Sequence, residues 1–263
     1  MQQHRPDKPP PRKSLGQHFL RDEAVIERII ACFGPAPQDL VVEIGPGRGA
    51  LTFRLAGQLR ELHVVEIDKA LVKALTRQQE GYPGLHIHAA DAMTLDYCAL
   101  AAGRRLRIIG NLPYNVSTPL LFKFLHDRHC IRDMVLMLQK EVVDRMCASP
   151  GGRDYGRLSV MLQQSCSVDE LFEVGPGAFD PPPKVNSAVV RLAPYPHPPH
   201  PVGDPGHFSR VVQTAFSQRR KTIRNALKLL VDGAMLAHAG IDPGARPETL
   251  SVADYVRLSE LSR

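Results

Sequence analysis

The chain has 263 residues, of which 43% are hydrophobic and 23% are charged, and this composition excludes a disordered or fibrous protein. Its formal net charge of +6 favours an anionic partner without identifying one. No apolar run reaches the roughly 18 residues of a membrane-spanning helix, and the N-terminal end lacks the apolar core of a signal peptide, so we expect a soluble, cytoplasmic protein. The five cysteines are scattered without a Cys-x-x-Cys pair, which predicts neither a disulfide framework nor a zinc site and agrees with a reducing compartment.

Composition along the chain predicts four segments. Residues 1–13 are rich in proline and basic residues and predict a flexible basic arm, either a solvated tail or a contact with RNA phosphates. Residues 14–195 carry the strand and helix patterns of one α/β domain, and residues 196–206 form a proline-rich linker. Residues 207–263 predict a small helical domain.

Four strands predicted in the α/β domain end in residues that can bind a ligand. They cover residues 40–44, 62–67, 85–91 and 106–109, and their hydrophobic runs are typical of buried parallel strands. The residues at their C-terminal ends are Gly45, Glu66, Asp91 and Asn111. An open α/β sheet binds its ligands at this edge, and Glu66 stands where the hydroxyl pair of a ribose would be bound. A carboxylate after a strand can also simply cap the next helix, and this alternative stays open for Asp91.

The turn after the first of these strands is rich in glycine. Gly45, Gly47 and Gly49 follow the spacing Gly-x-Gly-x-Gly rather than the Gly-x-Gly-x-x-Gly of dinucleotide-binding enzymes. Pro46 removes a backbone N–H that a phosphate group would use. The turn therefore predicts a nucleotide-type ligand without a pyrophosphate, and it disfavours a nicotinamide-dependent oxidoreductase.

The tetrapeptide after the fourth strand, Asn111-Leu112-Pro113-Tyr114, predicts a site for an amino group. Asn111 offers a side-chain carbonyl, and Leu112 precedes a proline, which favours an extended backbone whose carbonyl can point the same way. Tyr114 adds a flat ring on which a base can stack. We interpret the tetrapeptide as a clamp for the exocyclic amine of adenine; the alternative is an ordinary proline turn.

Two histidines of the third strand raise the question of a metal site. His86 and His88 lie two residues apart and would share one face of the strand. This spacing suits a metal ion, but the sequence shows no acidic or cysteine partner for them. The interpretation that we prefer is a half-buried strand face, with no metal bound.

The rest of the α/β domain reads as helices over residues 118–126, 141–147 and 155–166 and a strand over residues 134–138. Residues 171–192 predict a returning β-hairpin that a proline-rich stretch, residues 179–187, interrupts. This stiff stretch could hold Phe179 against a ligand, although Phe179 could equally be a core aromatic residue.

The C-terminal domain contains a cluster of basic residues. Residues 219–230 predict one continuous helix with Lys221, Arg224 and Lys228 on one face and Ile223, Leu227 and Leu230 on the other. Five cations without a local acid favour contact with RNA phosphates over a merely solvated face. The predicted RNA-binding residues are Arg219, Arg220, Lys221, Arg224 and Lys228.

Taken together, the motifs resemble the rRNA adenine N6,N6-dimethyltransferase family, and within it the bacterial type that acts on 16S rRNA. The resemblance covers nearly the whole chain. It rests on Gly16-Gln17-His18-Phe19-Leu20, Glu43-Ile44-Gly45-Pro46-Gly47, Asn111 to Tyr114, Leu138-Gln139-Lys140-Glu141, Tyr155-Gly156-Arg157-Leu158-Ser159, Phe179 to Ser187 and Gln218-Arg219-Arg220-Lys221-Thr222.

This resemblance implies a class I, Rossmann-like sheet and S-adenosyl-L-methionine as cofactor, with no metal. It implies cofactor binding by His18, Leu20, Gly45, Glu66, Asp91 and Asn111, and catalysis by Asn111, Leu112, Pro113, Tyr114 and Phe179. Relatives often carry Asn at the position of His18. The implied substrate is a pair of adjacent adenosines in the hairpin loop near the 3′ end of 16S rRNA, which a monomeric enzyme dimethylates during small-subunit assembly.

Two related functions stay open. The 23S rRNA adenine methyltransferases that confer macrolide resistance share the clamp, although residues 218–222 and 181–183 favour the 16S type. The other alternative is an RNA-binding assembly factor that has lost catalysis. The intact Glu66, Asp91 and clamp residues disfavour it.

Overall fold

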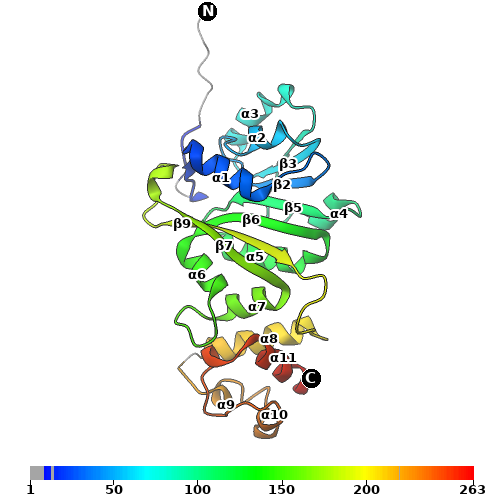
Figure 1. The fold of residues 1–263 in the computed structure, drawn as a ribbon, viewed down its shortest axis with the longest axis vertical. Coiled ribbons are helices and arrows are strands. Elements are labelled where there is room, and N and C mark those ends of the chain that lie inside the picture. Colours follow the sequence, from blue (N-terminus) through cyan, green and yellow to red (C-terminus); the bar gives the residue numbers. More distant parts are fainter. Residues whose placement is uncertain (1–8, 13–14, 219) are drawn as a thin grey trace, which may run out of the picture. The chain divides into compact units, whose positions relative to one another are not determined.

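The structure is a computed structural model, and it describes residues 9–12, 15–218 and 220–263 (Figure 1). Most of the predicted basic arm and Arg219 lie outside these ranges. The chain forms two compact units, of which the first comprises the residues up to Val143 and Asp169–Pro194. The second comprises Asp144–Val168 and Tyr195–Arg263. Within the described ranges, no helix combines the length and the apolar character needed to cross a membrane.

The first unit is built on a seven-stranded sheet with the order β4-β3-β2-β5-β6-β9-β7 (Figure 1). The strands are β2 (Leu40–Ile44), β3 (Glu61–Glu66), β4 (Leu85–Ala89), β5 (Leu106–Asn111), β6 (Ile131–Gln139), β7 (Cys166–Val174) and β9 (Ser187–Pro194). β4, β3, β2, β5 and β6 are parallel, and β9 runs antiparallel to β6. Every residue of β2 is buried, as expected of a parallel strand with helices on both faces. The predicted α/β class is confirmed.

Helices lie between the consecutive parallel strands. They are α2 (Thr52–Ala56), α3 (Lys69–Thr76), α4 (Tyr97–Ala101) and α5 (Ser117–His126), with the short 3-10 helices η2 (Gln79–Gly81) and η3 (Arg128–Cys130). α1 (Glu23–Phe33) precedes β2, α6 (Lys140–Cys147) follows β6, and the 3-10 helix η4 (Pro176–Ala178) follows β7. Asp22 caps α1 and Asp68 caps α3, because Asp22 accepts a hydrogen bond from the N–H of Val25 and Asp68 accepts one from the N–H of Ala70.

A second, very small sheet joins segments that lie far apart in the sequence. β1 (Phe19–Leu20) pairs antiparallel with β8 (Phe179–Asp180), and Leu20 lies opposite Phe179. The pairing brings the proline-rich stretch after Phe179 next to the Gly16–Leu20 segment. Sequence reasoning did not anticipate this contact, because two-residue strands carry no periodicity.

The second unit is helical. It consists of α7 (Arg157–Ser165), α8 (Pro205–Ser217), α9 (Ile223–Ala226), α10 (Gly233–His238), η5 (Pro247–Thr249) and α11 (Val252–Leu261). Its core surrounds the buried aromatic residues Tyr155, Phe208 and Tyr255. Residues 144–168 thus belong to the helical unit, whereas the sequence-based boundaries assigned them to the α/β domain. Tyr155 and Val160 pack into this core, and no local pattern signals that partner.

The prediction of one continuous basic helix over residues 219–230 is wrong. α9 covers only Ile223–Ala226, after Thr222 in an extended conformation, and it ends at Leu227. The apolar side of the pattern is nevertheless correct, because Ile223 and Leu227 are fully buried and Leu230 is partly buried against the same core. The backbone N–H groups of Ile223 and Arg224 donate to the carbonyls of Ala245 and Pro243 instead of to a preceding helical turn, so contacts with a distant segment override the helical propensity of the basic residues.

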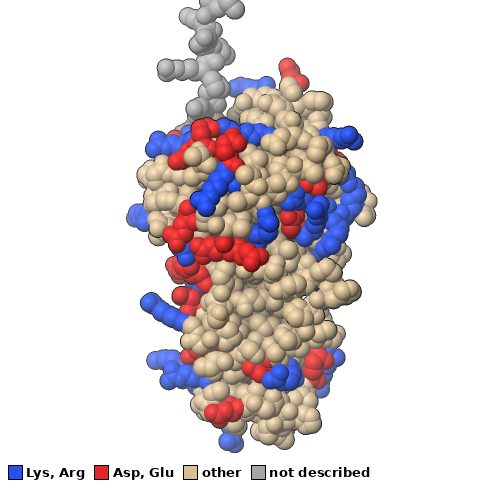
Figure 2. All heavy atoms as spheres, viewed as in Figure 1, with Lys and Arg blue, Asp and Glu red and all other residues tan. Residues whose placement is uncertain are grey.

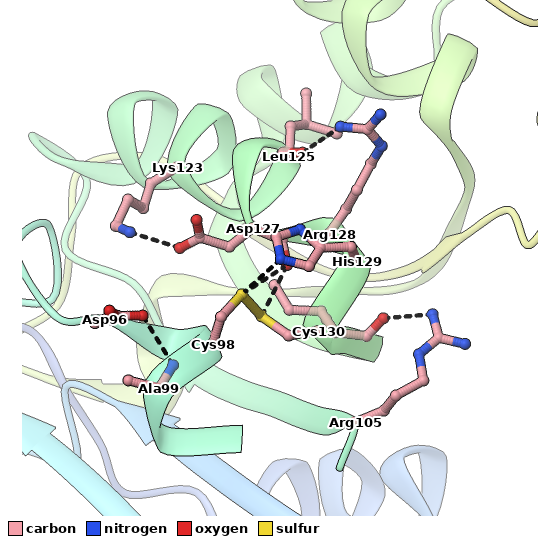
Figure 3. Close-up of a disulfide and its surroundings, with 11 residues drawn as sticks. Asp96, Cys98, Ala99, Arg105, Lys123, Leu125, Asp127, Arg128, His129 and Cys130 are labelled. Carbon is pink, nitrogen blue, oxygen red and sulfur yellow. Dashed lines mark hydrogen bonds and ion pairs between the residues drawn. A yellow bond between two sulfur atoms is a disulfide. The ribbon is translucent and has the colours of Figure 1, made fainter. Parts of the chain in front are cut away.

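The expectation that the cysteines form no disulfide is also wrong. Cys98 of α4 and Cys130 of η3 are joined by a disulfide with an S–S distance of 2.13 Å, and the ring of His129 lies beside it (Figure 3). The two cysteines are 32 residues apart in the sequence, and only the packing of α4 against η3 brings them together. The spacing of the cysteines therefore gave no signal of this pairing. Because a disulfide forms, the cysteine pattern no longer supports a reducing compartment.

Candidate active site

A cavity in the first unit lies at the C-terminal ends of β2, β3 and β5. The strand order reverses between β2 and β5, and α/β sheets bind ligands at such a point. Nine of the residues predicted from the sequence line the cavity: His18, Leu20, Gly45, Glu66, Asp91, Asn111, Leu112, Pro113 and Tyr114. The fold thus brings together residues that are spread over almost one hundred positions of the sequence.

The glycine-rich turn forms one wall of the cavity. Gly45 and Gly47 have φ angles of +64° and +57°, which favour glycine. A Cβ atom on Gly47 would lie 2.9 Å from Cδ1 of Phe19, so the loop can approach β1 only because this side chain is missing. The N–H of Gly45 is bound to the carbonyl of Val65. These glycines therefore shape a close-fitting wall, in agreement with a ligand that needs no phosphate-binding nest.

Glu66 is a buried carboxylate at the end of β3. Its Oε1 accepts a hydrogen bond from the N–H of Asp68 at 2.9 Å, and its Oε2 accepts one from the N–H of Gly47 at 3.3 Å. Burial raises the pKa of Glu66, and the two backbone donors oppose this effect. Each oxygen retains a second lone pair, so the carboxylate can accept hydrogen bonds from two neighbouring hydroxyl groups.

Asp91 follows β4 and is exposed. Its Oδ1 accepts a hydrogen bond from the N–H of Met93 at 2.8 Å, so one oxygen stabilises the turn after β4. Asp91 does not cap the next helix, because the N-cap of α4 is Asp96. The same side chain also lines the cavity. The hydrogen bond to Met93 thus fixes the carboxylate at the cavity wall, and a contact of this carboxylate with an adenine amino group stays a prediction.

Asn111 ends β5, two residues later than the sequence indicated. Gly110 permits this extension, because a Cβ atom there would lie 2.4 Å from the carbonyl oxygen of Ile44. The Nδ2 of Asn111 donates to the carbonyl of His18 at 3.0 Å. With the amide nitrogen held in this way, Oδ1 points in the opposite direction and serves as an acceptor. The N–H of Leu112 is bound to the carbonyl of Met137, which fixes the backbone of the next residue of the clamp.

Tyr114 is held from two sides. Its hydroxyl lies 2.7 Å from Oγ of Ser187, and its ring stacks on His18 with a centroid distance of 5.6 Å. Nδ1 of His18 lies 2.8 Å from the carbonyl of Pro181, so the imidazole is oriented as well. Burial raises the pKa of the Tyr114 hydroxyl, which stays neutral at physiological pH. The plane of the aromatic ring is thereby fixed before any base binds.

Phe179 occupies a different environment. Its side chain is 1% exposed and belongs to the main hydrophobic core of the first unit, with Leu20 and Ile109. Phe179 is not among the described residues that line the cavity. This environment is that of a core aromatic residue, and a contact of Phe179 with a base stays a prediction.

Sequence reasoning missed Glu43 as a residue of the cavity. It is 2% exposed in the middle of β2, lines the cavity and accepts a hydrogen bond from Oγ1 of Thr52 at 2.7 Å. Burial raises the pKa of Glu43 to about 8, so the carboxyl group is mostly protonated at neutral pH. A lone acid within a hydrophobic strand was the signal that could have identified it.

The predicted RNA-binding residues belong to the second unit. Arg220, Lys221, Arg224 and Lys228 are exposed, and Arg219 lies outside the described residues. On the face of the molecule drawn in Figure 2, basic side chains alternate with acidic ones. The distribution of charge on that face does not identify one RNA-binding surface. The assignment therefore rests on Arg220, Lys221, Arg224 and Lys228 themselves.

The residues of the cavity fit S-adenosyl-L-methionine. The cofactor offers hydrogen-bond donors at its ribose hydroxyls and its adenine amine, and the cavity provides the carboxylates of Glu66 and Asp91 as acceptors. Its sulfonium is positively charged. The apolar wall made by residues such as Ile67 and Leu71, together with the glycines, suits the adenine ring.

Comparisons with known proteins agree with this geometry. The family model described as ribosomal RNA adenine dimethylase matches residues 10–263. Ribosomal RNA small subunit methyltransferase A of Alcanivorax borkumensis is 54% identical over 253 residues, which cover 96% of this chain and 90% of the relative. The protein of the same name from Methylococcus capsulatus is 55% identical, with 95% of this chain and 96% of the relative covered.

Solved structures give the same result. A dimethyladenosine transferase from Plasmodium falciparum superposes with a TM-score of 0.79 at 26% identity and covers 92% of this chain and 96% of its own. The 23S rRNA methyltransferase ErmE has a TM-score of 0.71 at 27% identity, with 93% and 99% covered. The predicted class I methyltransferase fold is confirmed. By its sequence and its fold, the chain belongs to the ribosomal RNA adenine dimethylase family of S-adenosyl-L-methionine-dependent enzymes.

Proposed function

We propose that the chain transfers methyl groups from S-adenosyl-L-methionine to N6 of two adjacent adenosines in the 3′-terminal hairpin loop of 16S rRNA. The observation that carries the proposal is the oriented amide of Asn111, whose Nδ2 is bound to the carbonyl of His18 at 3.0 Å. Its Oδ1 then faces an incoming amine beside the stacked ring of Tyr114. The names of the relatives from Alcanivorax and Methylococcus support the small ribosomal subunit as substrate.

In this proposal, the cofactor supplies an electrophilic methyl group on its sulfonium. Glu66 accepts hydrogen bonds from the ribose hydroxyls, and Asp91 accepts one from the adenine amine of the cofactor. His18, Leu20 and Gly45 form the wall around the rest of the ligand. The apolar lining excludes water from the reacting atoms, which strengthens every hydrogen bond inside the cavity.

The clamp activates the amine of the target adenosine. The lone pair of this nitrogen is delocalised into the purine ring, so the amine is a poor nucleophile. Asn111 Oδ1 and the carbonyl of Leu112 each accept one N–H, which favours a pyramidal nitrogen whose lone pair points at the methyl group. Methylation makes the nitrogen acidic, and its proton can leave to water. No side chain is needed as a general base.

The target adenosine must leave its stack to reach the clamp. Unstacking is least unfavourable in an unpaired loop, which supports a hairpin loop as substrate. The exposed Arg220, Lys221, Arg224 and Lys228 bind phosphates of the RNA and need not read its sequence. We further propose that the chain works as a monomer on a small-subunit assembly intermediate in the cytoplasm.

A methyl-transfer assay with separated ribosomal subunits tests the proposal. Purified chain, labelled S-adenosyl-L-methionine and undermethylated small subunits should give labelled 16S rRNA, and large subunits from the same cells should stay unlabelled. Label in 23S rRNA alone would instead favour the second enzyme type, which the similarity to ErmE makes worth testing. Tight RNA binding without any transfer would favour a non-catalytic assembly factor.

A further inference from the structure

Four polar side chains share one face of the β3–β4 pair, away from the cavity. Glu61 and His63 lie two residues apart on β3, and His86 and His88 lie two apart on β4. The parallel register pairs His63 directly with His86. Because side chains alternate between the two faces of a strand, all four project from the same face. The acidic partner that the sequence did not reveal for His86 and His88 thus comes from the neighbouring strand.

The ligand atoms of this group converge. One ligand atom each from Glu61, His63 and His86 lie within 4.8 Å of one another. Oε1 of Glu61 is 3.1 Å from Nε2 of His63, and Nδ1 of His63 is 2.9 Å from Nε2 of His88. The rings of His63 and His86 stack with their centroids 4.8 Å apart. The donor atoms of Glu61, His63 and His86 therefore lie close enough to share one ligand.

We propose that Glu61, His63 and His86 form a binding site for a divalent transition-metal ion such as Zn²⁺. Two imidazoles and one carboxylate are a donor set that zinc sites use, with metal–ligand distances of about 2.0–2.2 Å. Tetrahedral ligands at such distances lie about 3.4 Å from one another. The separation of Glu61 Oε1 and His63 Nε2, 3.1 Å, already approaches this value. His86 is exposed, so its ring can turn towards the ion, and a water molecule completes the coordination.

Two neighbours orient the ligands. When Nε2 of His63 binds the ion, Nδ1 carries the proton and donates it to Nε2 of His88. Such a bond fixes the tautomer and the orientation of a metal-bound imidazole. Arg104 donates to the other oxygen of Glu61, Oε2, at 2.6 Å, which holds the carboxylate in place and leaves Oε1 for the metal. His63 itself is 7% exposed and is fixed by its packing.

The site is distinct from the catalytic cavity, since none of these four side chains is among the described residues that line it. β4 is the edge strand of the large sheet. A bound ion would therefore link this edge strand to β3. These two strands lead into Asp91 and Glu66, so the ion would stabilise the edge of the fold next to the cofactor-binding residues.

The described residues contain a second convergent group, Cys98, His129 and Cys130. Its two cysteines are joined in the disulfide of Figure 3, and a cysteine binds zinc strongly only as a free thiolate. Without a reductant the disulfide stays intact, so these cysteines do not compete with Glu61, His63 and His86 for the Zn²⁺ used in the test. A His129→Ala variant, which leaves the disulfide intact, identifies any metal that still binds there.

The test is isothermal titration of the full chain with Zn²⁺ in the absence of reductant. The unmodified protein should bind one equivalent, and His86→Ala should weaken the affinity by at least about tenfold. His126→Ala, which removes an equally exposed imidazole from α5, should bind as the unmodified protein does. Both histidines are exposed, so neither variant threatens the fold, and circular dichroism checks this point.

A thermal melt gives a second measurement. Zn²⁺ should raise the melting temperature of the unmodified chain and of His126→Ala, and it should leave that of His86→Ala unchanged. Absence of binding would show that Glu61, His63 and His88 are only a hydrogen-bonded chain and would overturn the proposal. Binding that survives His86→Ala but disappears in His129→Ala would also overturn it, because the ion would then belong to the group around the disulfide.

Discussion

Replacing Asn111 by alanine should affect catalysis much more than cofactor binding, because the two groups of its amide have different roles. The Nδ2 bond to the carbonyl of His18, 3.0 Å long, holds the segment that lines the cofactor side of the cavity. In the proposed reaction, Oδ1 accepts a hydrogen bond from the N6 amine of the target adenosine. Alanine removes both groups. Nδ2 contributes to cofactor binding, whereas Oδ1 contributes to the stability of the transition state for methyl transfer.

The two losses differ in size. A hydrogen bond between neutral groups contributes about 0.5–1.5 kcal/mol, so the affinity for S-adenosyl-L-methionine should fall by no more than about tenfold. Loss of one positioned polar group in a transition state reduces kcat by on the order of 10²–10³, or about 2.7–4 kcal/mol. We therefore expect Asn111→Ala to lower kcat far more than cofactor affinity.

Labelled methyl transfer to small subunits measures kcat, and calorimetry with the cofactor measures affinity. Gln78→Ala serves as a control, because it removes an exposed amide of the same unit that lies outside the cavity. A kcat of Asn111→Ala within about threefold of the unmodified enzyme would refute the clamp. Equal losses of kcat and of cofactor affinity would refute the separation of the two roles.

Three further predictions concern other parts of the molecule. Glu66→Ala should weaken cofactor binding by roughly 1.5–3 kcal/mol, the range for hydrogen bonds to a charged group, and unchanged affinity in calorimetry would remove Glu66 from the site. The pKa of Glu43 is about 8 in the folded state, above its unfolded value of 4.5, so the folded state holds a proton that the unfolded state loses. The free energy of unfolding should therefore fall as the pH rises between these values, by up to about 1.4 kcal/mol per pH unit. Urea unfolding at several pH values should show that this free energy depends less on pH in Glu43→Gln than in the unmodified chain. Replacing Lys221, Arg224 and Lys228 together by Gln should make the slope of log K against log salt for RNA binding less steep by roughly 2–3, whereas parallel lines would indicate a solvated surface.

The sheet and its strand ends could be predicted because their signals are local. Each parallel strand is a hydrophobic run, and the ligand-binding edge of such a sheet is fixed by its topology. Nine of the predicted residues consequently line one cavity. The basic segment of the second unit could not be predicted in the same way, because α9 covers only Ile223–Ala226 and its first N–H groups bind the carbonyls of the distant Ala245 and Pro243.

Contacts between segments that lie far apart in the sequence could not be predicted from local patterns. The pairing of Leu20 with Phe179, the disulfide from Cys98 to Cys130 and the approach of Glu61 to the histidines of β4 all depend on tertiary packing. Local periodicity contains no information on which segments meet. The sequence could show that His86 and His88 share a strand face, but the register with β3 is needed to find their partners.

The central claim is that this chain dimethylates two adjacent adenosines of 16S rRNA. Mass-spectrometric mapping of adenosine methylation on 16S rRNA, from cells with and without this protein, tests it most directly. We predict N6,N6-dimethyladenosine at two neighbouring positions of the 3′-terminal hairpin loop when the protein is present, and unmodified adenosine at both when it is absent or carries Asn111→Ala. Identical dimethylation in cells with and without the protein would contradict the claim.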